Sequence, residues 1–191
     1  DEALAANTTG QYGCAFGHQA LESNTTANSN NAFGYAALHD NVTGANNCAF
    51  GYSALNAYTG SDNCAFGNYT LYVATTGDNN TAMGYKALMD TTTGANNVAI
   101  GAYALTENTT GDSNVAVGAQ ALSSATTASE NTAVGYQCMD TLTTGHNNVA
   151  IGQKAMDDAT SAVGNIAIGR YCLADVTNGT SNTAIGAYDG T

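Results

Sequence analysis

A short pattern, alanine followed by an apolar residue and a glycine, recurs along the whole chain and limits what the chain can fold into. It occurs eleven times, from residues 15–17 to residues 184–186, in 17-residue steps such as that from Ala82 to Ala99. The single 16-residue step runs from Gly51 to Gly67. A fixed period of this length indicates a solenoid, in which each repeat forms one coil that stacks on the next. The 191 residues are therefore predicted to form one elongated array.

The array is expected to fill residues 1–191 as a single repeat domain. Residues 1–10 match half a coil, full coils cover 11–186, and the pattern decays over 187–191. The shorter step is expected to lack a residue in the turn near 56–58, because a deletion costs least in a turn. Neither end carries a polar cap, so the chain is expected either to be part of a longer fibre or to associate end to end.

Two strands are predicted in each coil, one over the Asn-x-Ala-apolar-Gly run and one around the leucine that follows it, such as Leu105. Strands at the same place in successive coils must run parallel. The fold class is therefore an all-β parallel β-solenoid, a β-roll or β-helix, of about eleven coils with two main strands each. Since side chains alternate along a strand, we assign the large residue after each alanine, and the leucine, to the interior. The alanine then faces outward.

An alanine that is the same in all eleven repeats is unexpected on a solvent-exposed surface, where polar residues would also occur. Either the coil is so thin that both faces are covered, or another chain packs on this face. The second alternative predicts a homo-oligomer whose interface follows the alanine stripe. In the central coils this stripe consists of Ala49, Ala65, Ala82, Ala99, Ala116, Ala133 and Ala150.

Asparagine opens nearly every repeat, two residues before the alanine. Stacked amides can donate to and accept from the amides above and below, which forms a ladder that fixes the register of the coils. The sequence therefore predicts a structural role, not a ligand site, for this column. Its central members are Asn47, Asn63, Asn80, Asn97, Asn114, Asn131 and Asn148.

Composition excludes several functions. Fifteen acidic residues against three basic ones give a formal charge of -12, which argues against binding nucleic acid or an anionic membrane surface. The sequence has no run of 18 apolar residues, so no insertion into a membrane is expected. The three histidines, His18, His39 and His146, lie in different columns of distant coils, and no nucleophile motif occurs, so we expect no enzyme activity and no cofactor.

Five cysteines fall in two columns, with Cys14, Cys48 and Cys64 in one and Cys138 and Cys172 in the other. Cys48 and Cys64 are one coil apart and are close enough to form a disulfide, whereas Cys138 and Cys172 are two coils apart and too far. The simpler interpretation is that all five act as small buried apolar residues. Their spacing does not match a zinc site.

Two further patterns, one of aspartates and one of tyrosines, give weaker site hypotheses. Aspartates in one turn of successive coils form a candidate calcium site, because stacked carboxylates repel unless a cation intervenes. Tyrosines in two neighbouring columns, one directly after the glycine and one, with Tyr103, further along, would suit glycan binding or a packing interface. The calcium candidates are Asp140, Asp157, Asp158 and Asp175, and the tyrosines are Tyr35, Tyr52, Tyr85, Tyr103 and Tyr136.

Threonine pairs such as Thr109-Thr110 form ranks along the array. Adjacent residues of a strand point to opposite faces, so one threonine rank at most faces water, which fits ice binding poorly. The glycosylation sequons at Asn7, Asn24, Asn41 and Asn108 lie in the turn before the threonines, a place expected to be exposed.

The repeat resembles known surface proteins. Asn-Asn-Val-Ala-Ile-Gly at 96–101 and 147–152, with Asn-Thr-Ala-Ile-Gly at 182–186, resembles the head repeats of trimeric autotransporter adhesins. The longer Thr-Thr-Gly-x-x-Asn-x-Ala-apolar-Gly-x-x-Ala-Leu repeat is similar to the 17-residue repeats of bacteriophage tail fibres. The resemblance covers essentially the whole chain and implies left-handed parallel β-rolls that pack as trimers.

These observations predict a non-enzymatic structural protein of an extracellular, cell-surface or virion fibre. Its main partner would be itself, through flat solenoid faces or through its uncapped ends. An adhesin or tail-fibre segment that binds a cell-surface glycan or receptor is the alternative, and an ice-binding protein is a more distant one.

Overall fold

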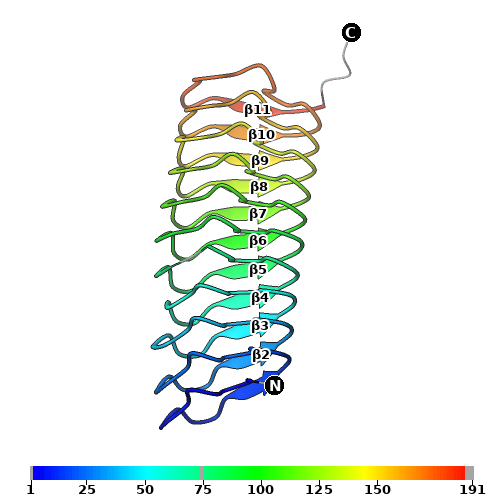
Figure 1. Ribbon diagram of the computed structural model, residues 1–191. Coiled ribbons are helices and arrows are strands. Elements are labelled where there is room, and N and C mark those ends of the chain that lie inside the picture. Colours follow the sequence, from blue (N-terminus) through cyan, green and yellow to red (C-terminus); the bar gives the residue numbers. More distant parts are fainter. Residues whose placement is uncertain (1, 74, 188–191) are drawn as a thin grey trace.

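The computed structural model describes residues 2–73 and 75–187, and most of the expected decay over 187–191 lies outside the described residues. Eleven parallel strands form one sheet in chain order, and each strand leads through one coil to the next, as the stacked ribbons of Figure 1 show. The β-solenoid predicted from the repeat is therefore confirmed. The strands are β1 (Cys14–Phe16), β2 (Asn31–Phe33), β3 (Cys48–Phe50), β4 (Cys64–Phe66), β5 (Thr81–Met83), β6 (Val98–Ile100), β7 (Val115–Val117), β8 (Thr132–Val134), β9 (Val149–Ile151), β10 (Ile166–Ile168) and β11 (Thr183–Ile185). The described part of the chain contains no helix that could cross a membrane.

The register places each repeat directly over the next. Ala99 pairs with Ala116 across β6 and β7, and the same alanine-on-alanine pairing holds along the sheet. The shorter step keeps this register, because Ala49 still pairs with Ala65. The missing residue is therefore absorbed outside the strands, as expected, in a coil whose interior holds the fully buried Tyr58.

The prediction of a second strand in each coil is wrong. The segment around each leucine consists of turns. Beyond the named strands the described residues show only isolated parallel bridges, which join Ser129 to His146, His146 to Val163 and Val163 to Thr180. Leu105 has a φ of 51°, which is left-handed and costs a bulky residue about 1–2 kcal/mol. Its side chain is fully buried, and its N–H donates to the carbonyl of Ala121 in the next coil at 3.0 Å. These contacts offset the strain, and the leucine column is interior as predicted.

The assignment of inner and outer residues in the strands is also wrong. Ala99 is fully buried in one cluster with Ala104 and Leu105, whereas Ile100 is 37% exposed and Phe50 is 46% exposed. The reason is size: a coil this short encloses so little space that the strand can contribute only methyl groups to the core. Neither explanation for an outward alanine applies, because the alanines face inward and the opposite face of the strand is partly exposed. The residues assigned to an oligomer interface lie inside the solenoid instead: Ala49, Ala65, Ala82, Ala99, Ala116, Ala133 and Ala150.

The asparagine ladder is confirmed. Asn114 donates from Nδ2 to Asn97 Oδ1 at 3.2 Å and to the carbonyl of Ala128 at 2.7 Å. Its Oδ1 accepts from the backbone N–H and from Nδ2 of Asn131, both at 3.1 Å. The side chain is fully buried, so each amide satisfies groups that would otherwise be unpaired in the core. The ladder continues through Asn47, Asn63, Asn80, Asn97, Asn114, Asn131 and Asn148.

A second inward column includes the sequon asparagines, which were expected to be exposed. Asn41 and Asn108 are fully buried and Asn24 is 2% exposed, whereas Asn7 in the first coil is exposed as expected. Asn108 caps its own turn, because Nδ2 donates to the carbonyl of Gly111 and Oδ1 accepts from the Gly111 N–H, both at 3.0 Å. A glycan on these side chains would have to enter the core.

Thr91 occupies this inward column and gives the first testable prediction. In the part of the chain that the structure describes, Thr91 Oγ1 is the one buried side-chain polar atom without a hydrogen-bond partner. We expect Thr91→Val to stabilise the protein by about 1 kcal/mol, because the unpaired hydroxyl is removed. The control is Thr70→Val, which should destabilise by about 1 kcal/mol, because Thr70 Oγ1 donates to the carbonyl of Gly67 at 2.8 Å. Melting temperatures that shift in the same direction for both variants would contradict this account.

Candidate functional site

The outer side of the sheet is the surface with the clearest functional character. We call it the sheet face, and it consists of the first and third residues of every strand. Its exposed large apolar residues are Phe16, Phe50, Phe66, Met83, Ile100, Ile151, Ile166 and Ile185. Because the strands are stacked in register, the third residues form one continuous apolar rank along the solenoid. The first residues form a second rank, in which apolar residues are interspersed with the polar Asn31, Thr81, Thr132 and Thr183. An apolar surface of this extent is unusual on a protein that stays alone in water.

The sheet face carries no charge. None of the eleven described strands contains an acidic or basic residue, although the chain has a formal charge of -12. The acidic side chains therefore lie on the turns and leave one side of the coil free of charge. Charged residues are depleted in the same way at the centres of protein interfaces.

The sheet face also changes character along its length. The first four strands carry phenylalanines that stack on one another, with ring centroids 6.4 Å apart for Phe16–Phe33, 4.6 Å for Phe33–Phe50 and 5.7 Å for Phe50–Phe66. From β5 onward the corresponding residue is methionine, isoleucine or valine. One end of the face is therefore aromatic and the other aliphatic.

The tyrosines lie next to the sheet face, in the turn after the glycine. Tyr35 and Tyr52 stack with centroids 5.0 Å apart and an interplanar angle of 9°. Tyr69 continues the row to Tyr85, which meets Tyr103 edge to face at 5.4 Å. Because the stacked rings cover one another's faces, a ligand would contact the edges of the tyrosine rings. Tyr35, Tyr52, Tyr85, Tyr103 and Tyr136 are between 40% and 47% exposed.

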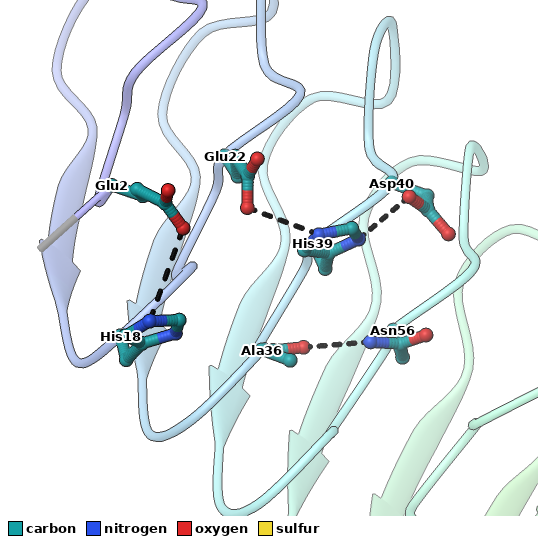
Figure 2. Close-up of polar contacts among 7 residues, drawn as sticks. All are labelled: Glu2, His18, Glu22, Ala36, His39, Asp40 and Asn56. Atoms are coloured by element: carbon teal, nitrogen blue, oxygen red, sulfur yellow. Dashed lines mark hydrogen bonds and ion pairs between the residues drawn. The ribbon is translucent and has the colours of Figure 1, made fainter.

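His39 is the histidine with the closest acidic partners. Its Nε2 lies 3.1 Å from Glu22 Oε2 and its Nδ1 lies 2.6 Å from Asp40 Oδ1, so the carboxylates flank the ring in Figure 2. His18 lies 3.9 Å from Glu2 in the preceding coils. With both ring nitrogens of His39 facing carboxylates, neither one faces a hydroxyl or thiol that it could activate. The geometry supports a surface polar cluster.

Two of the four aspartates of the candidate calcium site have protein partners. Asp157 accepts from Lys154 Nζ at 3.0 Å, and Asp140 accepts from the hydroxyl of Ser123. No group of three or more His, Cys, Asp or Glu among residues 2–73 and 75–187 is arranged to hold a metal ion. Calcium binding by Asp140, Asp157, Asp158 and Asp175 stays a prediction, which the melting temperature with and without chelator tests.

The threonine ranks divide as the alternation predicts. Thr92 and Thr109 each donate their hydroxyl to the threonine carbonyl of the next coil at 2.9 Å, so this rank is used within the solenoid. Thr93 and Thr110, of the other rank, are exposed. A single free rank offers ice a narrow surface, and ice binding stays a prediction that thermal hysteresis tests.

The cysteines differ from the expectation that all five are buried. Cys138 and Cys172 lie in the interior, whereas Cys48 and Cys64 are half-buried and Cys14 is exposed on the sheet face. The three outer thiols follow from the same reversal of inner and outer faces. All five are free thiols in the structure.

Cys138 gives a prediction about alkaline pH. Burial raises the pKa of its thiol to about 12, above a value of about 8.5 in an unfolded chain. The buried neutral thiol therefore contributes stability that is complete below about pH 8.5 and is lost as the pH rises toward 12. We expect the melting temperature of the natural chain to fall more steeply over this range than that of Cys138→Ala, which carries the residue usual in this column. Parallel curves for the two proteins would contradict the buried position of the thiol.

No protein-family model, no curated protein and no solved structure matches this chain. The assignment of the fold therefore rests on the coil geometry, and the choice of a function rests on the sheet face.

Proposed function

We propose that the protein is a non-enzymatic structural component of an extracellular or virion surface fibre, and that its rods associate with one another through the sheet face. The observation that carries the proposal is the charge-free sheet face, whose rank of third strand residues is apolar through all eleven described strands. The resemblance of the repeat to adhesin heads and tail fibres agrees with this role. The alanines do not contribute to this contact, because they are in the core.

The size of the sheet face fits an interface between copies. Ten steps of about 4.8 Å make it roughly 48 Å long, and two ranks of side chains make it roughly 10 Å wide. One copy would therefore contribute about 500 Å², and a pair would bury about 1,000 Å², which is the lower end of specific interfaces. A second copy supplies a surface of the same length, flatness and apolar character, and it brings no unpaired charge into the contact.

The hydrogen-bond pattern suits a stiff rod. Each coil is joined to the next by backbone bonds in the strand, such as that from the Val98 N–H to the carbonyl of Asn114 at 2.8 Å, and by the asparagine ladder. The turns add further bonds, such as that from the Leu88 N–H to the carbonyl of Ala104 at 3.0 Å. Bonds at several points around each coil resist bending in every direction.

Charge placed on the sheet face tests the proposal. We expect the double variant Ile100→Lys, Ile151→Lys to associate at least tenfold more weakly than the natural chain in sedimentation velocity, because two charges would have to be desolvated in the contact. The matched control is Thr110→Lys with Thr127→Lys, which adds the same charge at exposed turn positions. Equal association of the two double variants, both folded by circular dichroism, would contradict the proposal.

A second candidate is an adhesin or tail-fibre segment that binds a glycan. The observation in its favour is an open groove beside the tyrosine row, where Tyr35, Tyr52 and Tyr72 lie next to His39 and Asn56. Aromatic edges and polar side chains together can recognise a sugar. Binding on a glycan array that is lost in Tyr52→Ala would support this candidate, and an array without hits would remove it.

A further inference from the structure

Two cysteines on the sheet face are direct neighbours in the register. Cys48 opens β3 and Cys64 opens β4, and the two residues pair across these strands. Both are half-buried and both are free thiols. Because side chains at paired positions of parallel strands point to the same side, the two sulfurs lie on the same surface.

The spacing of neighbouring strands suits a covalent bond at this pair. Strands in a parallel sheet are about 4.8 Å apart, and disulfides join residues whose Cα atoms are about 4.4–6.8 Å apart. The Cβ atoms of a disulfide are about 3.5–4.5 Å apart, so a small local approach of the two Cβ atoms brings the sulfurs together. Burial raises the pKa of the Cys64 thiol, and the charge and a hydrogen bond of Cys48 raise it further. The two thiols are therefore close enough to interact.

We propose that Cys48 and Cys64 form a disulfide between adjacent coils when the protein meets a small-molecule disulfide. In the first step the thiolate of one cysteine attacks the small disulfide, forms a mixed disulfide and releases one small thiolate. In the second step the other cysteine attacks the protein sulfur of that mixed disulfide and releases the second small thiolate. The two protein thiols are oxidised by two electrons, and the small disulfide is reduced to two thiols.

The bond would act on the irregular coil of the solenoid. Cys48 and Cys64 are separated by the one shortened step of the array, so the disulfide closes a loop around the coil that lacks a residue. A closed loop of this length is expected to raise the melting temperature by roughly 5–10 °C, since it restricts the unfolded chain. The bond forms within one chain and does not rest on the proposed self-association.

The other cysteines serve as internal controls. Cys14 pairs with Asn31 in the register, so it has no thiol opposite it. Cys138 and Cys172 are buried and lie two coils apart, so they cannot bridge. Oxidation of the folded protein should therefore consume two thiols in a disulfide and leave these three as thiols or, at Cys14, as a mixed disulfide.

The test is to incubate the folded chain with oxidised glutathione at about pH 8.5, where thiolates of ordinary pKa are abundant. The remaining thiols are then blocked by alkylation, and the peptides are mapped by mass spectrometry. The reaction is run on the natural chain and on the Ile100→Lys, Ile151→Lys variant, in which association does not cover the sheet face. We expect an intramolecular Cys48–Cys64 disulfide, faster at higher pH, with a higher melting temperature. Cys64→Ser should instead leave a glutathione adduct on Cys48 and no rise in melting temperature, and Cys138→Ser should behave as the natural chain does.

Several results would overturn the proposal. One is that Cys48 and Cys64 of the Ile100→Lys, Ile151→Lys variant both remain thiols that can be alkylated. The others are stable glutathione adducts on both cysteines and a disulfide that links two chains. Failure of the self-association test leaves these outcomes unchanged, because the disulfide is measured within a single chain.

Discussion

Replacing Gly101 by alanine is expected to destabilise the protein by about 4 kcal/mol or more, one of the largest effects of any single substitution. Gly101 follows β6 with a φ of 138°, a backbone conformation open essentially to glycine alone. An alanine Cβ at this place would overlap the backbone of Gly118 in the next coil and would lie 2.9 Å from the N atom of Ala119. Neither the Gly118 backbone nor the Ala119 N atom can move away, because both belong to the hydrogen-bonded backbone of the next coil.

A second glycine separates backbone strain from overlap. Gly164 also has a positive φ, of 68°, but an added Cβ there would meet nothing closer than 3.8 Å. Gly164→Ala should therefore cost only about 1 kcal/mol, the usual penalty for an alanine in the left-handed region. Thermal and urea unfolding followed by circular dichroism measure both variants. A loss at Gly101 no larger than at Gly164 would mean that the coils are not packed as closely as described.

Replacing Asn114 by aspartate is expected to destabilise the protein by about 3–5 kcal/mol at neutral pH, although the side chain keeps its size. The aspartate loses the donor that now binds Asn97 Oδ1 and the carbonyl of Ala128, and its carboxylate faces these two acceptor oxygens. The position is fully buried, so water cannot screen the charge. A variant that instead truncates the side chain, Asn114→Ala, breaks the same bonds without adding a charge.

The pH dependence distinguishes the charge from the lost bonds. Burial raises the pKa of an aspartic acid in the folded state, so the penalty is complete above that pKa and is relieved as the pH falls through it. Asn114→Asp should therefore approach Asn114→Ala in stability as the solution is made acidic. The control is Asn79→Asp at an exposed position, which should change stability by less than about 0.5 kcal/mol. An Asn114→Asp protein as stable as Asn79→Asp would contradict the buried ladder.

The period of the sequence predicts the fold because each coil places the same residue types at the same positions. The solenoid, the parallel strands, the inward leucines and the asparagine ladder all follow from which residues recur at which place. What the hydrophobic pattern could not decide is which side of the strand faces inward. In Val98-Ala99-Ile100, alternation puts Val98 and Ile100 on one side and Ala99 on the other, and greater hydrophobicity favours the wrong side.

A signal for the correct side was present in the sequence. Asn97 and Ala99 are two residues apart and therefore share a face. A ladder of amides that fixes the register is strongest in the core, where water does not compete for its hydrogen bonds. A buried Asn97 therefore implies a buried Ala99 and an exposed Ile100, which in turn moves Cys48 and Cys64 to the sheet face.

The left-handed leucines could not have been predicted from local propensity. Leu105 at a φ of 51° is unfavourable in any short peptide. It becomes acceptable because the neighbouring coil supplies a carbonyl for its N–H and an apolar environment for its side chain. Since these contacts come from residues about one repeat away, the turn conformation depends on the stack and not on the segment itself.

The most direct test of the self-associating rod is a cryo-electron microscopy map of the protein at a concentration where sedimentation shows assembly. We predict that neighbouring rods meet along their sheet faces, with the rank that contains Ile100 and Ile151 enclosed between them and the alanine column inside each coil. A map in which the rods meet through their turns, with this rank open to water, would contradict the account.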